Sequence, residues 1–124
     1  MTEYLDLDDL LAAAQAAVGG PPEIRDIGLL EAAAARPQVT VFGADAYPDL
    51  DTKAAALLHS IVTSHPLVDG NKRLGWVATR LFDLLNDVDL RPPADDAYDL
   101  VVAVANGSIR DVDPIARTLA GWRT

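Results

Sequence analysis

Nine consecutive residues near the middle of the chain carry most of the side chains that could do chemistry. They run His65-Pro66-Leu67-Val68-Asp69-Gly70-Asn71-Lys72-Arg73. His65 is the one group among them that accepts a proton near neutral pH without a large pKa shift, so it is a candidate general base. Asp69 offers hard oxygen atoms, which suit Mg²⁺ bound to nucleotide phosphates.

The second half of this stretch has the composition of an anion site. Gly70 allows positive φ and close approach of the backbone to a ligand. Asn71 can cap a helix or bond a phosphate oxygen, and Lys72 and Arg73 add a point charge and a planar fork. The residues that follow, Trp76 to Leu85, predict a helix with an apolar face. A helix start presents free N–H groups and partial positive charge, so the stretch predicts a phosphate or nucleotide site.

A simpler interpretation is an ordinary helix start with an Asp-Gly turn and solvated cations. It accounts well for Asp69 and Gly70. It accounts poorly for their combination with His65 and two adjacent cations.

The segment HPLVDGNKR resembles the signature of the Fic/Doc family, and its lysine is typical of the Doc (death-on-curing) branch. The resemblance extends upstream to the segment Arg25–Glu31, to Ala35–Gln38 and to Tyr47–Leu50. It covers the chain from about Tyr4 to Trp122.

This resemblance implies an all-α Fic-type fold and a toxin of a toxin–antitoxin pair. It implies transfer of the terminal phosphate of ATP, or another nucleoside triphosphate, to a protein hydroxyl with Mg²⁺. The implied target is the translation elongation factor that delivers aminoacyl-tRNA. By position, His65 matches the base and Asp69 the acid near the metal, and the anion-binding loop is matched by Gly70, Asn71, Lys72 and Arg73.

Lys72 distinguishes two chemistries in this family. AMP-transferring relatives have glycine there, and the resemblance to Doc implies that the nucleotide binds in the reverse orientation, with its terminal phosphate facing the target hydroxyl. Two alternatives stay open: an AMP-transferring enzyme of the same fold, and a catalytically silent binding module.

The chain departs from its relatives at Leu67, where aromatic residues are common and the side chain packs into the core. No [ST]-x-x-x-E-[GN] stretch is present, so we expect inhibition to come from a separate small antitoxin protein. The alanine-rich segments Leu10–Val18 and Ile27–Ala35 offer shallow surfaces on which a helix of such a partner could dock.

Length and composition favour one domain, residues 1–124, with a packed core. The chain lacks cysteine, which excludes disulfides and thiolate metal sites. Its net charge of −9 argues against direct nucleic-acid binding. The apolar runs are too short and too charged to cross a membrane, and no leader segment is evident, so we expect a cytoplasmic protein.

The pattern predicts about six helices. The first follows the acids before Leu10 and ends at Gly19, and the second spans Ile27–Ala35. Between Gln38 and Phe42 the β-branched residues predict a short extended segment, with Gly43 and Asp45 in a turn. In the resembling family this region is a flap that holds the target, here Val39, Thr40, Val41 and Phe42.

The third helix is predicted from Asp49 or Asp51 to about Ser64, with His59 on a polar or packing surface. The helix after the central stretch is expected to be the core helix, with an inward face of Leu74, Val77, Leu81 and Leu84. Trp76 is assigned to the core or to a groove rather than to nucleotide stacking. A fifth helix should start at Asp95 or Asp96 and end at Asn106-Gly107, with Leu100, Val101 and Val104 inward, and a sixth should run from about Asp111 or Asp113 to Trp122.

Overall fold

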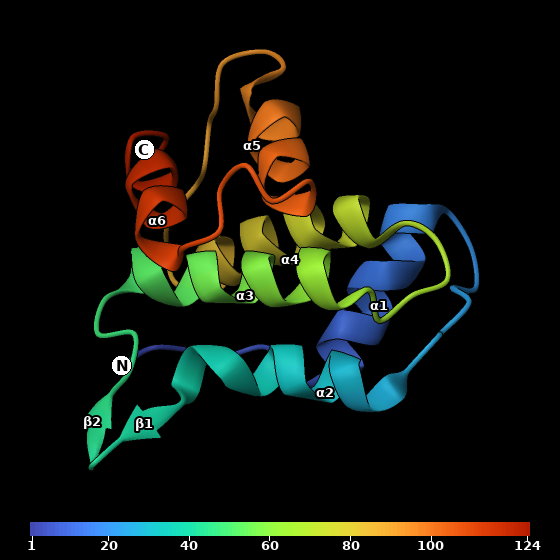
Figure 1. The fold of residues 1–124 in the computed structure, drawn as a ribbon, viewed down its shortest axis with the longest axis horizontal. Helices are drawn as coiled ribbons and strands as arrows, with labels where there is room; N and C mark the ends of the chain where they lie inside the picture. Colours follow the sequence, from blue (N-terminus) through green and yellow to red (C-terminus); the bar gives the residue numbers. More distant parts are fainter.

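The computed structural model describes residues 1–124 and confirms an all-α fold with a small hairpin (Figure 1). The elements in chain order are α1 (Leu7–Val18), α2 (Ile27–Ala35), the short 3₁₀ helix η1 (Arg36–Gln38), β1 (Thr40–Val41), β2 (Ala44–Asp45), α3 (Leu50–Ser64), α4 (Asn71–Leu85), α5 (Asp96–Ala105) and α6 (Val112–Ala120). None of the helices has the length and apolar character that crossing a bilayer requires.

Aspartate side chains begin the first three helices. Asp6, Asp26 and Asp49 accept hydrogen bonds from backbone N–H groups three residues further on, at 2.9, 3.2 and 2.8 Å. These bonds satisfy N–H groups that have no partner within the helix. Asp49, and not Asp51, is therefore the cap of α3. At the other end of α1, Gly19 takes the left-handed conformation that stops a helix.

Helix α3 lies at the centre of the molecule. It packs against α4, α6, α2 and α5, with α2 on one side and α5 and α6 on the other in Figure 1. Helices α3 and α4 approach closely where Gly75 meets Val62, because a Cβ on Gly75 would lie 2.6 Å from a Val62 methyl group. One core of 25 buried residues joins all six helices.

The predicted inward face of α4 is wrong for Leu81 and Leu84. These side chains are 38% and 49% exposed, whereas Leu74, Ala78 and Phe82, spaced four residues apart, are buried. Gly75 and Thr79 lie on the same buried side. Small residues let α4 approach α3 closely, so backbone proximity rather than the largest number of leucines decided which face turned inward. The helix also starts earlier than the predicted Trp76, at Asn71.

The predicted extended segment is only partly extended. Gln38 belongs to η1, and Thr40–Val41 pairs with Ala44–Asp45 in an antiparallel hairpin. The turn is made by Phe42 and Gly43, both at positive φ (52° and 80°), so Asp45 is in a strand and not in the turn. A buried lysine, Lys53, anchors the hairpin by donating to the Asp45 carboxylate (3.2 Å) and to the Tyr47 carbonyl.

The remaining helices lie where they were predicted, except that α1 already begins at Leu7 and α6 ends at Ala120, two residues before Trp122. Leu100, Val101 and Val104 are buried on α5, and Leu67 is buried as expected. His59 has a packing role, since its Nδ1 lies 2.7 Å from the Arg36 guanidinium. Burial lowers the pKa of His59, and the positive charge of Arg36 lowers it further.

Asp83 is a buried carboxyl group without a hydrogen-bond partner. Its side chain on α4 is fully buried, and neither oxygen has a donor. Burial raises its pKa to about 7, and the nearby Asp51 carboxylate adds to the shift while Arg123 opposes it. The folded protein therefore holds a proton on Asp83 that an unfolded chain releases near pH 3.8.

We expect Asp83→Leu to stabilise the protein above pH 4. As pH rises from about 4 to about 7, the unfolded chain loses this proton and the folded chain keeps it, so stability falls by up to ~4 kcal/mol at 1.36 kcal/mol per unit. Urea denaturation should show that the variant loses less stability than the parent between pH 5 and pH 8. Asp99→Leu, at an exposed site on α5, is the control, and equal pH slopes in Asp83→Leu and the parent would contradict the assignment.

Candidate active site

The loop between α3 and α4 carries the predicted catalytic stretch. His65 is the C-cap residue of α3 and has a left-handed backbone, φ 56°. A residue with a Cβ pays about 1–2 kcal/mol for this conformation, which glycine adopts freely. The loop must therefore compensate for the strain at the residue whose imidazole is the candidate base.

Hydrogen bonds hold the loop from outside and from within. On the outside, Arg25 donates from Nε to the His65 carbonyl (2.6 Å) and from Nη2 to the Ser64 carbonyl (2.8 Å). Inside, Asn71 accepts from the Leu67 N–H and donates to the Leu67 carbonyl, both at 2.9 Å. The side-chain amide of Asn71 is therefore occupied within the loop. Only the backbone N–H of Asn71 remains free for a phosphate.

Helix α4 starts without a cap. Its N-cap residue is Gly70 (φ 91°), which has no side chain to accept a hydrogen bond. Leu74 is the first residue of α4 whose N–H finds a backbone acceptor, at Gly70 (2.9 Å). The N–H groups of Asn71, Lys72 and Arg73 are free, in contrast to the capped starts of α1 to α3. Free N–H groups and the positive end of a helix dipole are suited to an anion.

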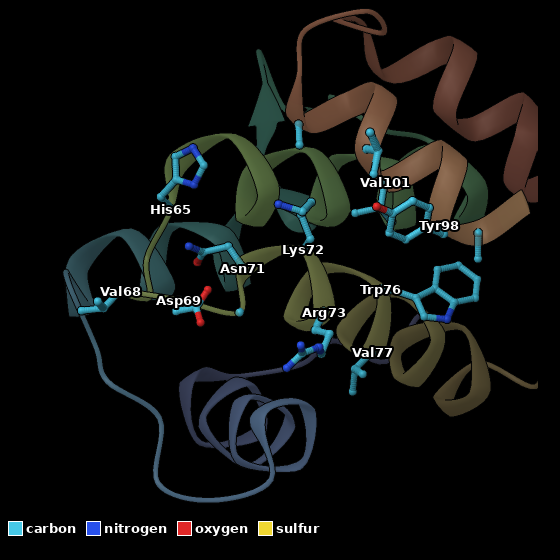
Figure 2. Close-up of a pocket in the computed structure, with 14 residues that line it drawn as sticks. His65, Val68, Asp69, Asn71, Lys72, Arg73, Trp76, Val77, Tyr98 and Val101 are labelled. Atoms are coloured by element: carbon cyan, nitrogen blue, oxygen red, sulfur yellow. The ribbon is translucent and has the colours of Figure 1, made fainter. Parts of the chain in front are cut away.

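A cavity of about 600 Å³ lies over this helix start. Its polar end is formed by His65, Asp69, Gly70, Asn71, Lys72 and Arg73. Figure 2 shows His65 and Lys72 on the side of α3, while Arg73 extends toward α1. Asp69, Lys72 and Arg73 are exposed and form no ion pair within the chain, so their charges are available to a ligand.

The other end of the cavity is apolar. Trp76 and Val77 of α4 face Ala97, Tyr98, Val101, Val102 and Ala105 of α5 there. Trp76 packs edge-on against Trp122, with ring centroids 6.0 Å apart, which agrees with its predicted place in a groove. Sequence reasoning missed the contribution of α5, because its alanines and valines look like ordinary core residues.

The structure does not bring the predicted flap to this cavity. Val39, Thr40, Val41 and Phe42 are exposed, and none of them lines it. The hairpin is anchored at Lys53 near the start of α3, whereas His65 follows the end of that helix, which is about 22 Å long at 1.5 Å per residue. Figure 1 shows the hairpin and the loop after α3 at opposite ends of the molecule.

Fold and site together define a small helical domain with an uncapped, cationic helix start beside a histidine. The model of the Fic/DOC family matches residues 4–82, and the chain belongs to this family. A curated relative is Toxin Doc from Mycolicibacterium smegmatis (strain ATCC 700084 / mc(2)155). It is 52% identical over 124 residues, which cover 98% of this chain and 95% of the relative.

We expect Gly70→Ala to destabilise the loop. The added Cβ would lie 2.7 Å from a Val18 methyl group, and the backbone is at positive φ. Gly43→Ala is a matched control, because Gly43 also has positive φ (80°) but no atom within 4 Å of the new Cβ. Urea denaturation should show Gly70→Ala to be less stable than Gly43→Ala by about 1–3 kcal/mol, the usual cost of overpacking. Equal losses would mean that Val18 moves aside without cost.

Proposed function

We propose that this protein is the toxin of a toxin–antitoxin pair that transfers the terminal phosphate of ATP, or another nucleoside triphosphate, to a protein hydroxyl. The observation that carries the proposal is the uncapped start of α4, with Lys72 and the candidate base His65 beside it in one cavity. Membership of the Fic/Doc family and the relative named Toxin Doc support it. We propose the translation elongation factor that delivers aminoacyl-tRNA as the target, a small antitoxin protein as the partner and the cytoplasm as the place of action.

The cavity has the two kinds of surface that a nucleotide needs. Phosphates would accept hydrogen bonds from the free N–H groups of α4, with Lys72 and Arg73 balancing their charge. The base and ribose would lie at the apolar end, between Trp76 and Tyr98. A volume of about 600 Å³ is within the usual range of small-molecule sites.

His65 would act as the general base. As the target oxygen forms its bond to the terminal phosphorus, the bond from that phosphorus to the bridging oxygen breaks and the nucleoside diphosphate leaves. The hydroxyl proton passes to the imidazole of His65, which is exposed at the polar end of the cavity. Lys72 and Arg73 would offset negative charge on the transferred and bridging oxygens.

The donors at the site fit Mg²⁺ held jointly with a nucleotide. Asp69 has an exposed carboxylate without an ion-pair partner, and no cluster of three potential ligand side chains exists in the chain. Mg²⁺ commonly binds one or two carboxylates, with phosphates and water completing its shell. Asp69 would hold the ion, which supplies charge neutralisation to the phosphates.

We expect His65→Ala to keep the fold and lose phosphate transfer. A positioned base is typically worth 10²–10⁴-fold in rate, and the His65 side chain is exposed, so its removal leaves the core intact. The rate is measured with purified elongation factor and ATP. His59→Ala, which removes the other histidine outside the cavity, is the control and should retain transfer. Near-parental transfer by a folded His65→Ala chain would exclude His65 as the base.

The orientation of the nucleotide can be tested by isotope labelling. We expect label from the terminal phosphate of ATP to reach the target and label from the α-phosphate to stay in solution, with a mass gain of one phosphate. Lys72→Gly should lose most of this transfer, because the lysine charge would no longer face the terminal phosphates. The control is Arg80→Gly, which removes another exposed cation of α4 outside the cavity.

The opposite labelling pattern would identify an AMP-transferring enzyme. If neither label reaches the target and a partner still binds normally, the protein is a catalytically silent module.

A further inference from the structure

The four residues before α2, Glu23 to Asp26, are bonded to the loop between α3 and α4. The N–H groups of Arg25 and Asp26 both donate to the Pro66 carbonyl, at 2.8 and 3.0 Å. The Val68 N–H donates to the Glu23 carbonyl at 2.9 Å, and Ile24 forms a bridge with Leu67. These backbone bonds fix the loop after His65, at Pro66 to Val68, but they do not reach His65 itself.

The Arg25 side chain reaches the part of the loop that these bonds leave out. Its Nε and Nη2 donate to the two successive carbonyls of His65 and Ser64, at 2.6 and 2.8 Å. These carbonyls belong to the end of α3, where backbone acceptors lack partners within the helix and a cation is favourable. The Arg25 side chain itself is exposed, so its contribution is these two bonds rather than packing in the core.

A fork that bonds two successive carbonyls constrains the two peptide units to which they belong. These units, Ser64–His65 and His65–Pro66, meet at the Cα of His65. Their relative orientation sets the direction in which the His65 side chain leaves a strained, left-handed backbone. Two donors at a fixed angle are a property of guanidinium that the ammonium of lysine does not share.

We propose that Arg25 is a positioning residue for His65, holding the imidazole where it can accept a proton from the target hydroxyl. The inference rests on the proposed phosphate transfer. The two halves of the site then depend on different residues. Arg25 orients the base, whereas Asn71 and the free N–H groups of α4 form the phosphate half without any contribution from Arg25. Loss of Arg25 should therefore slow transfer without weakening nucleotide binding.

The experiment compares Arg25→Met and Arg25→Lys with the parent and with Arg117→Met, which removes an exposed arginine of α6. Purified elongation factor and ATP give kcat and the KM for ATP, and urea denaturation gives stability. We expect kcat of Arg25→Met to fall about 10- to 100-fold, since a misplacement of about 1 Å can cost 10²-fold. The KM for ATP should stay within about twofold of the parent, and Arg25→Lys should recover only part of kcat.

A second readout does not depend on activity. His59→Ala leaves His65 as the single histidine, so its ring and Cα signals can be followed by NMR in the presence and absence of the Arg25→Met change. We expect the Cα shift of His65 to move away from its left-handed value, while the Val68 amide stays protected because its bond to Glu23 is retained.

The two readouts distinguish the possible failures. Parental kcat in Arg25→Met, or unchanged His65 signals, would overturn the positioning role. A fall in stability and in ATP binding that matches the fall in kcat would also overturn it, by making Arg25 a part of the fold. If the parent itself transfers no phosphate, the proposed function fails, and the NMR comparison still decides whether Arg25 sets the conformation of His65.

Discussion

The close approach of α3 and α4 at Gly75 is the constraint on which the site depends. A Cβ there would meet Val62 at 2.6 Å and Leu58 at 3.0 Å, so the two helices can lie at this separation only with glycine. Their proximity lets a loop of residues 65–70 join them and places the end of α3 beside the start of α4. The candidate base at one helix end and the candidate anion site at the other helix start are thereby brought to one cavity.

No side chain accepts a hydrogen bond from the N–H groups at the start of α4. Aspartates cap α1, α2 and α3, but at the corresponding position of α4 the chain has Gly70. An aspartate there would occupy the N–H groups that we propose bind a phosphate, and it would add to a net charge of −9. Helices α5 and α6 also lack a side-chain cap bond, but their N-cap residues are aspartates, and α4 is the one α-helix whose N-cap residue has no acceptor side chain.

The loop between α3 and α4 contains both a strained residue and the hydrogen bonds that hold the loop in place. The left-handed backbone at His65 is unfavourable for a residue with a Cβ, and the bonds from Arg25 and Asn71 hold the loop on both sides of it. Arg25 lies forty residues before His65 in the chain, so this support is a tertiary interaction. The same is true of the cavity's apolar end, where Tyr98 and Val101 arrive from α5.

The sequence by itself determined the helices and the polar half of the site. Helix ends depend on local signals, such as the Asp49 cap and Gly19, and the residues that form the polar end of the cavity are consecutive in the chain. The tertiary structure decided which face of α4 is buried, that Phe42 is in a turn, that α5 closes the cavity and that Arg25 holds His65. The Phe42 turn belongs to the local hairpin of Thr40–Val41 and Ala44–Asp45, but the other three depend on contacts between residues distant in sequence. Periodicity carries no information about how closely two backbones approach or which carbonyl a long side chain reaches.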